Sequence, residues 1–162
     1  MNGFQQLGDR LLVIYDGHCG LCNRSVHWFL VRDLRDRLRF APSESPDVAE
    51  LLARNGSADP ASAANPTAAK PTAANPSPIP DSIVVARNPG TPAEQILFRS
   101  DAVLALLGEL PSPWPAIGKI LNWIPRPLRD LGYRLIARWR YHIWGRLESC
   151  PIPTPAERAR FL

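Results

Sequence analysis

The chain has 162 residues, of which 45% are hydrophobic and 21% are charged, and its formal net charge is +4. This length fits one domain with a real core, and the composition excludes a disordered chain. Three cysteines are too few for a secreted scaffold held together by disulfides. The first ten residues lack the pattern of a signal peptide and no apolar run reaches about 18 residues, so we expect a cytoplasmic protein without a membrane span.

A pair of cysteines follows the first predicted strand. Residues 11–15 are apolar throughout, which predicts a strand buried on both faces, and residues 23–35 have the spacing of an amphipathic helix. Cys19 and Cys22 lie between the two, where unpaired N–H groups and the helix dipole favour an anion. We therefore expect an accessible Cys19 to attack disulfides as a stabilised thiolate, and a more shielded Cys22 to resolve the mixed disulfide.

Other interpretations of the cysteines stay open. The pair could form half of a zinc site, which needs about four ligands that only Cys150 and His18, His27 or His142 remain to supply. It could also be chemically inert. Cys150 could pair with Cys19 if the fold brings them together, or be a spare thiol. The strand and helix around the pair favour the redox interpretation.

The next elements complete a β-α-β unit and add a second helix. Residues 37–41 predict a short strand parallel to the first, with a right-handed crossover. Ser45, Pro46 and Asp47 have the pattern of an N-cap and a first helical turn, and Asn55 marks the end of that helix.

Residues 57–78 differ from the rest of the chain in composition. Ala, Pro, Asn, Thr and Ser dominate, and without large apolar side chains they cannot offset the entropy of ordering, which predicts a disordered insertion. Residues 82–86 and 95–98 then predict an antiparallel hairpin, followed by a helix that Ser100 caps with Asp101 in its first turn. This order is typical of an α/β thioredoxin-like sheet, and we expect residues 10–162 to form a single domain.

Residues 111–147 form a predicted C-terminal helical extension that packs against the core near the cysteines. Helices are predicted over 114–124 and 127–144, the second with one apolar side made of Leu128, Leu131, Leu135 and Ile136. This stretch contains seven basic residues and one acidic residue. The charge fits a solvated helix face. The alternative is peripheral contact with an acidic membrane through these Trp-rich helices, and we expect no nucleic-acid partner.

The residues around the cysteines resemble a known family signature. It is the pattern of the DCC family of thiol-disulfide oxidoreductases, named after one aspartate and two cysteines, and is carried here by Asp16, Gly17, Cys19, Leu21, Cys22 and Asn23. Further family segments resemble residues 100–102, 133–141 and 150–153, so the likeness covers 10–54 and 80–162.

The resemblance implies a thioredoxin-like fold and a disulfide-exchange activity. The expected substrate is a disulfide-containing protein or a small-molecule thiol. No metal or organic cofactor is expected, and glutathione or a thioredoxin-type protein would be the reductant.

Three residues near the cysteines have two interpretations each. Asp16 acts as a general base on Cys22 or caps the N–H groups of the loop. His18 stabilises the thiolate as an imidazolium or is an exposed loop residue. Pro80 is the cis-proline that thioredoxin-like proteins place beside the active cysteine, or an ordinary proline at the start of a strand.

Residues later in the chain are supporting candidates. Ser100 and Asp101 bind the glutathione carboxylate at a helix start, as in glutaredoxin-like relatives of the fold, or only cap the helix, which we favour. Arg140, with Tyr133 and Tyr141 on the same side of its helix, stabilises the thiolate or forms a buried structural cluster.

Overall fold

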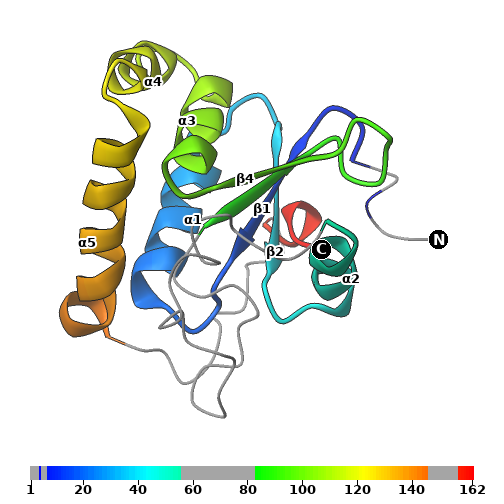
Figure 1. Cartoon of the computed structure of the whole chain (residues 1–162). Helices are drawn as coiled ribbons and strands as arrows, with labels where there is room; N and C mark the ends of the chain where they lie inside the picture. The colour runs from blue at the N-terminus through cyan, green and yellow to red at the C-terminus, as the bar shows by residue number, and fades with distance from the viewer. Residues whose placement is uncertain (1–3, 5–6, 56–82, 146–156) are drawn as a thin grey trace.

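A four-stranded mixed sheet lies at the centre of the part of the chain that the structure, a computed structural model, describes: residues 4, 7–55, 83–145 and 157–162. The sheet order is β2-β1-β3-β4, and β1 and β2 are parallel, whereas β3 is antiparallel to both β1 and β4. The strands are β1 (Leu11–Tyr15), β2 (Leu38–Pro42), β3 (Val84–Arg87) and β4 (Gln95–Phe98) (Figure 1). The predicted insertion at 57–78 lies outside the described residues.

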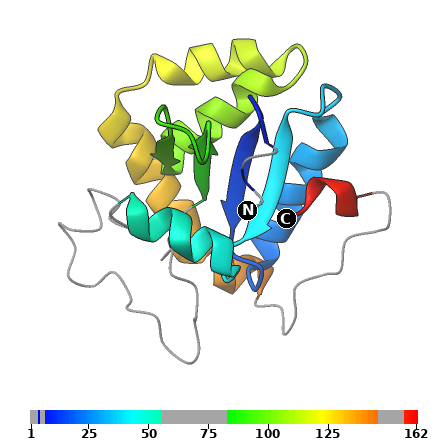
Figure 2. The same ribbon diagram turned by 90° about the vertical axis from the view of Figure 1, so that its right-hand side faces the viewer.

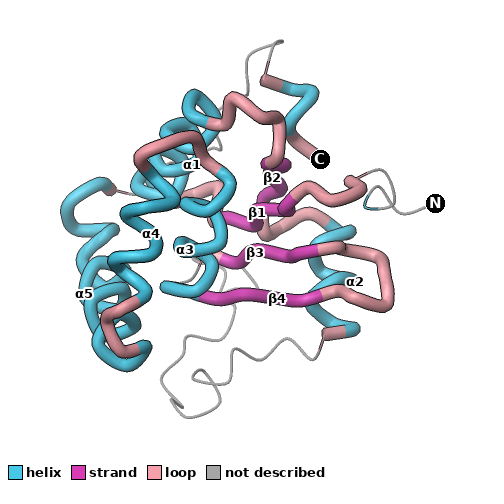
Figure 3. Tube along the Cα trace, turned by 90° about the horizontal axis from the view of Figure 1, so that it is seen from above, coloured by secondary structure: helices cyan, strands magenta, loops and turns pink. Residues whose placement is uncertain are grey.

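Helices cover both faces of this sheet. α1 (Gly20–Arg32) and α3 (Arg99–Glu109) pack on one face, and α2 (Pro46–Arg54) packs on the other (Figure 3). With the β-α-β unit, the hairpin of β3 and β4 and the helix that follows, this is the α/β arrangement of a thioredoxin-like fold, as predicted.

The buried strand β1 separates two hydrophobic clusters. Successive side chains of a strand point to opposite faces, so Leu11, Val13 and Tyr15 enter the cluster under α1 and α3. Leu12 and Ile14 enter the cluster under α2. All five residues of β1 are buried, which confirms the prediction of burial on both faces.

Local signals predicted both ends of α2 correctly. The Ser45 side chain accepts a hydrogen bond from the Val48 N–H at 3.4 Å, and the helix starts at Pro46 with Asp47 in its first turn. The helix ends at Arg54, directly before Asn55. These signals act within one turn of the chain and need no tertiary contact.

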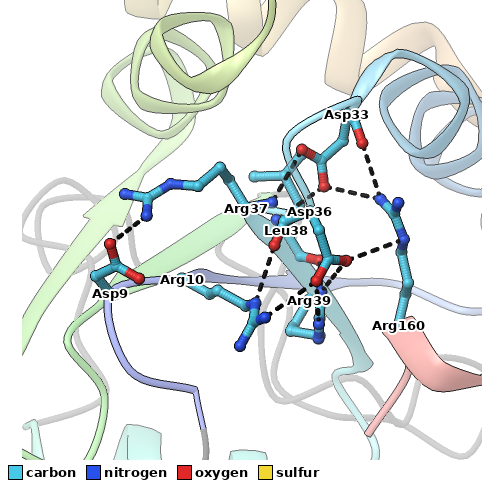
Figure 4. A network of polar contacts seen from close by, with 8 residues as sticks. All are labelled: Asp9, Arg10, Asp33, Asp36, Arg37, Leu38, Arg39 and Arg160. Carbon is cyan, nitrogen blue, oxygen red and sulfur yellow. Dashed lines mark hydrogen bonds and ion pairs between the residues drawn. The ribbon is translucent and has the colours of Figure 1, made fainter.

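A buried carboxylate, Asp33, holds the turn from α1 to β2 (Figure 4). One of its oxygens accepts the Arg37 N–H at 3.0 Å, and the other accepts the Leu38 N–H at 2.9 Å and a guanidinium N–H of Arg160 at 2.8 Å. Asp33 is 1% exposed, so its acceptor oxygens lie away from bulk water. The carboxylate therefore joins the end of α1, the start of β2 and the C-terminal segment.

That C-terminal segment closes against the edge strand β2 (Figure 2). It contains the short 3₁₀ helix η2 (Arg158–Arg160), after which Phe161 forms a parallel bridge to Phe40 and the Leu162 N–H donates to the Phe40 carbonyl at 3.0 Å. The rings of Phe40 and Phe161 lie 5.6 Å apart. This cover shields part of an otherwise open sheet edge.

The extension forms a layer outside α1 and α3. Its helices are α4 (Trp114–Asn122) and α5 (Arg126–Trp144), close to the predicted bounds (Figure 1). None of the described helices is both long and apolar enough to cross a membrane.

The apolar side of α5 is largely exposed. The four predicted apolar residues are 48–59% exposed: Leu128, Leu131, Leu135 and Ile136. Ala137 is buried instead, and the Tyr133 hydroxyl accepts the Ile83 N–H at 2.7 Å. A small residue and a hydrogen-bonding ring therefore allow α5 to approach α1 and the start of β3.

Candidate active site

Cys19 occupies the N-cap position of α1. Its backbone is extended, and its Sγ accepts a hydrogen bond from the Cys22 N–H at 3.3 Å. The sulfur therefore takes the place that a serine or aspartate oxygen has in other helix caps. A thiolate gains more from this contact and from the helix dipole than a neutral thiol does. The helix begins at Gly20, three residues earlier than predicted, because the cysteine itself is the cap.

Side-chain hydrogen bonds hold the loop that presents this sulfur. The carboxylate of Asp16 is buried and accepts the His18 N–H at 2.9 Å, and the Asp16 carbonyl accepts the Cys19 N–H at 3.3 Å. The Asn23 side chain donates to the carbonyls of Gly17 at 2.7 Å and Cys19 at 3.1 Å. Asp16 thus caps the loop, one of its two predicted interpretations. The role as a general base stays a prediction.

Asn23 is a positioning residue whose role was not predicted. It closes the family signature directly after the second cysteine, and its amide reaches back over one turn to two loop carbonyls. An asparagine in the first turn of a helix, directly behind a loop, is the signal that could have identified it.

The accessibility of the two sulfurs is the reverse of the predicted one. Cys19 is 0% exposed, whereas Cys22 is half-buried and lines a cavity. The N-cap geometry turns the first sulfur back toward the amides of α1, and the end of α5 reaches the same loop, where the Gly20 N–H donates to the Gly145 carbonyl at 3.5 Å. This contact also confirms that the extension packs near the cysteines.

The cavity beside Cys22 has a volume of about 530 Å³ and lies between α1, α3, α4, α5 and the start of β3. Most of its lining is apolar, including Leu21, Phe29, Leu104, Leu121 and Ile136. A few residues with polar side chains interrupt this lining, namely Tyr15, Cys22, Ser25, Ser100, Arg129 and Tyr133. The site can therefore enclose an apolar group against one thiol.

Ser100 and Asp101 link two helices and do not cap α3. The helix starts at Arg99, which has a left-handed φ of +51°, so its N-cap is Phe98, whose side chain has no atom to accept a hydrogen bond. The Ser100 hydroxyl instead donates to the Asp130 carboxylate of α5. The predicted serine cap was wrong, although Asp101 does lie in the first turn.

Asp101 connects the start of α3 to α5 through two arginines. Its carboxylate lies 3.1 Å from Arg126 and 3.3 Å from Arg129. The predicted alternative placed a glutathione carboxylate beside the first turn of α3. The carboxylate that lies there belongs to Asp130. The predicted glutathione site therefore coincides with an internal α3–α5 contact.

The remaining predicted site residues are only partly described. His18 is half-buried in the loop before Cys19, and its role toward the thiolate stays a prediction. Arg140 and Tyr141 lie on α5, but their side chains are outside the described part of the structure, as are Pro80 and Cys150.

Metal-ligating residues do not gather in the described part of the chain. No three His, Cys, Asp or Glu side chains there come close enough together to hold a metal ion. The zinc alternative drew its further ligands from Cys150, which is not described, and from His18, His27 or His142.

Comparison with known proteins identifies the family. The family model of DCC1-like thiol-disulfide oxidoreductases matches residues 13–146, which include Cys19, Cys22 and all of α5. The chain belongs to this family. Two relatives of this DCC1-like protein are similar over nearly the whole chain. The chain is 27% identical to the uncharacterised protein YuxK of Bacillus subtilis (strain 168), over 98% of this chain and 97% of the relative. It is also 27% identical to a chloroplastic DCC family protein of Arabidopsis thaliana, over 93% of this chain and 74% of the relative. No solved structure gives a significant match.

Proposed function

We propose that this DCC1-like protein exchanges disulfides through Cys19 and Cys22. The observation that carries the proposal is the 3.3 Å hydrogen bond from the Cys22 N–H to the Cys19 sulfur at the start of α1. It stabilises a thiolate within one helical turn of a second thiol, in a thioredoxin-like fold. The protein dithiol reduces a substrate disulfide to two thiols and becomes an intramolecular disulfide, so two electrons pass to the substrate.

The reaction uses only the two sulfurs and a thiol reductant. Glutathione or a thioredoxin-type protein would return the bridge to the dithiol, and the substrate would be a disulfide-containing protein or a small molecule. The cytoplasmic location stays a prediction.

A redox titration tests the proposal. Protein carrying Cys150→Ser is equilibrated in buffers of reduced and oxidised glutathione, alkylated, and analysed by mass spectrometry. We expect both thiols to become protected together, with one midpoint between about −270 and −120 mV, the range of thioredoxin-like proteins. Addition of Cys22→Ser provides the control, because one sulfur cannot close the bridge. Two free thiols in buffer dominated by oxidised glutathione would contradict the proposal.

A specific surface supports a second function, peripheral membrane attachment. The outer face of α4 and α5 exposes the apolar residues Trp123, Leu128, Leu131, Leu135 and Trp139, of which Trp123 is 90% exposed. On α5 these residues are three or four positions apart and thus share one side. Exposed basic residues accompany them: Lys119, Arg134 and Arg138. Aromatic and cationic side chains together on one helical surface fit an acidic lipid interface.

Vesicle co-sedimentation tests this attachment. We expect binding to vesicles with acidic lipids at low salt and a clear loss at high salt, because salt screens the attraction between arginines and lipid headgroups. Replacement of Trp123 and Trp139 by alanine should weaken binding at both salt concentrations, whereas Arg134→Gln with Arg138→Gln should remove mainly the salt-sensitive part. Equal binding to neutral vesicles, or none at low salt, would contradict the attachment.

A further inference from the structure

We infer that Cys22 is the thiol that attacks the substrate, that Cys19 resolves the mixed disulfide, and that the cavity beside Cys22 binds an apolar group next to the substrate disulfide. This inference rests on the proposed disulfide exchange and assigns the order of its steps and its substrate class. It reverses the order that the sequence predicts.

Access decides which sulfur attacks first. A thiolate attacks a disulfide sulfur directly, so the two sulfurs must meet along an open path. Cys19 is 0% exposed, whereas Cys22 lies in the wall of a cavity large enough for a small molecule. A substrate in that cavity therefore meets Cys22.

The position of Cys19 suits the second step. Its sulfur already contacts the backbone N–H of Cys22, so it needs no access to solvent to reach a mixed disulfide on its neighbour. The same hydrogen bond and the helix dipole favour its thiolate, which makes it available for attack. In the reverse direction, a reductant attacks Cys22 and the stabilised Cys19 thiolate leaves.

The two steps balance. The Cys22 thiolate forms a bond to one sulfur of the substrate disulfide and releases the other as a thiolate, which takes up a proton from solvent. The Cys19 thiolate then bonds to the Cys22 sulfur and releases the second substrate thiolate. Two protein thiols are oxidised to one disulfide, and one substrate disulfide is reduced to two thiols.

The lining of the cavity indicates the substrate class. Most of the lining comes from apolar side chains such as Leu21, Phe29 and Leu104, and Arg129 in the same lining is already paired with Asp101. Burying the several charges of a glutathione molecule among these groups would cost their hydration without equivalent partners. An aromatic or aliphatic group attached to the disulfide instead gains from the burial.

Part of the cavity lining is both apolar and exposed. Ile124, Leu128 and Ile136 line the cavity and at the same time belong to the exposed apolar surface of the extension. An apolar substrate can therefore contact this exposed surface and the cavity lining at the same time.

Single-thiol variants test the order of the steps. In a Cys150→Ser background, Cys19→Ser leaves only Cys22 and Cys22→Ser leaves only Cys19. Each folded variant is mixed with the neutral aromatic disulfide dithiodipyridine, and thiopyridone release is followed with time. We expect the variant that keeps Cys22 to react at least about tenfold faster, because exposure controls thiol reactivity in the folded state. Equal rates, or a faster variant with Cys19, would overturn the assigned order.

Filling the cavity tests the binding site. Gly132 lines it, and a Cβ placed at Gly132 meets no described heavy atom within 4 Å, so the Cβ of Gly132→Phe causes no clash at this position. Gly108 has the same free space but lies outside the cavity, which makes Gly108→Phe a matched control. With Cys22 as the only thiol, we expect Gly132→Phe to slow dithiodipyridine at least about fivefold and the control to leave the rate unchanged.

Oxidised glutathione completes the comparison. For each disulfide, the rate with the folded Cys22-only protein is divided by the rate with the denatured protein. We expect this ratio to be smaller for oxidised glutathione than for dithiodipyridine. An unchanged rate in Gly132→Phe, or a preference for glutathione, would overturn the apolar site. If the two thiols form a disulfide in the glutathione titration but the Cys19-only variant reacts faster with dithiodipyridine, the proposed disulfide exchange stands and this inference fails. If the dithiol never closes, the proposed function itself fails.

Discussion

Removal of either sulfur, by Cys19→Ser or Cys22→Ser, is expected to slow multiple-turnover reduction of a peptide disulfide by at least about a hundredfold. A protein with one thiol stops at the mixed disulfide and must wait for an external thiol. The neighbouring sulfur, one helical turn away, acts at an effective concentration far above that of millimolar glutathione. The measurement is the rate at which reduced peptide appears in the presence of glutathione.

Cys150→Ser provides the control for this experiment. An unchanged rate in that variant would agree with the interpretation of Cys150 as a spare thiol, whereas a large loss would give it a role as a resolving thiol. Turnover at the wild-type rate in both Cys19→Ser and Cys22→Ser would contradict catalysis by the pair.

Replacement of Asp33 by asparagine is expected to lower the free energy of unfolding by about 3 kcal/mol, as for the loss of one partner from a buried ion pair. The carboxylate is buried and accepts from two backbone N–H groups and Arg160. An amide keeps only one acceptor oxygen and places an NH₂ group against a donor. The denaturation midpoint in urea, at an unchanged slope, gives the difference.

Asp36→Asn is the matched control, because this aspartate lies in the same network but its side chain is 45% exposed (Figure 4). We expect it to cost less than about 1 kcal/mol. Hydrogen bonding from Arg39 lowers the pKa of Asp36 from 3.8 to about 2. Its contribution should therefore be complete above pH 3.8 and disappear as the pH falls toward about 2. Equal costs for Asp33→Asn and Asp36→Asn would contradict the central role of the buried carboxylate.

Most secondary structure of this protein follows from short-range patterns. The apolar run of β1 requires burial on both faces, and Ser45, Pro46 and Asp47 start α2 through contacts within one turn. The two cysteines lie at a helix start because a strand and an amphipathic helix adjoin them. The thioredoxin-like order of elements follows from these local units and from the rules for connecting them.

The side of a helix that meets the core, and the distant residues that pair with a side chain, could not be predicted in the same way. α5 has apolar residues on more than one side, so its periodicity does not say whether Leu131 or Ala137 meets the core. Asp33 has the sequence context of an exposed helix end, and its burial depends on Arg160, which is 127 positions away. Ser100 has the appearance of a cap, but Asp130 of α5 takes its hydroxyl.

The sequence by itself determined the family, the fold and the placement of two thiols at the start of α1, because these depend on neighbouring residues. Only the tertiary structure decided which sulfur can be reached. The exposure of a side chain depends on surfaces that folding brings together, and those that enclose Cys19 and open a cavity beside Cys22 include parts of α3, α4 and α5, far along the chain. No pattern within the signature itself carries that information.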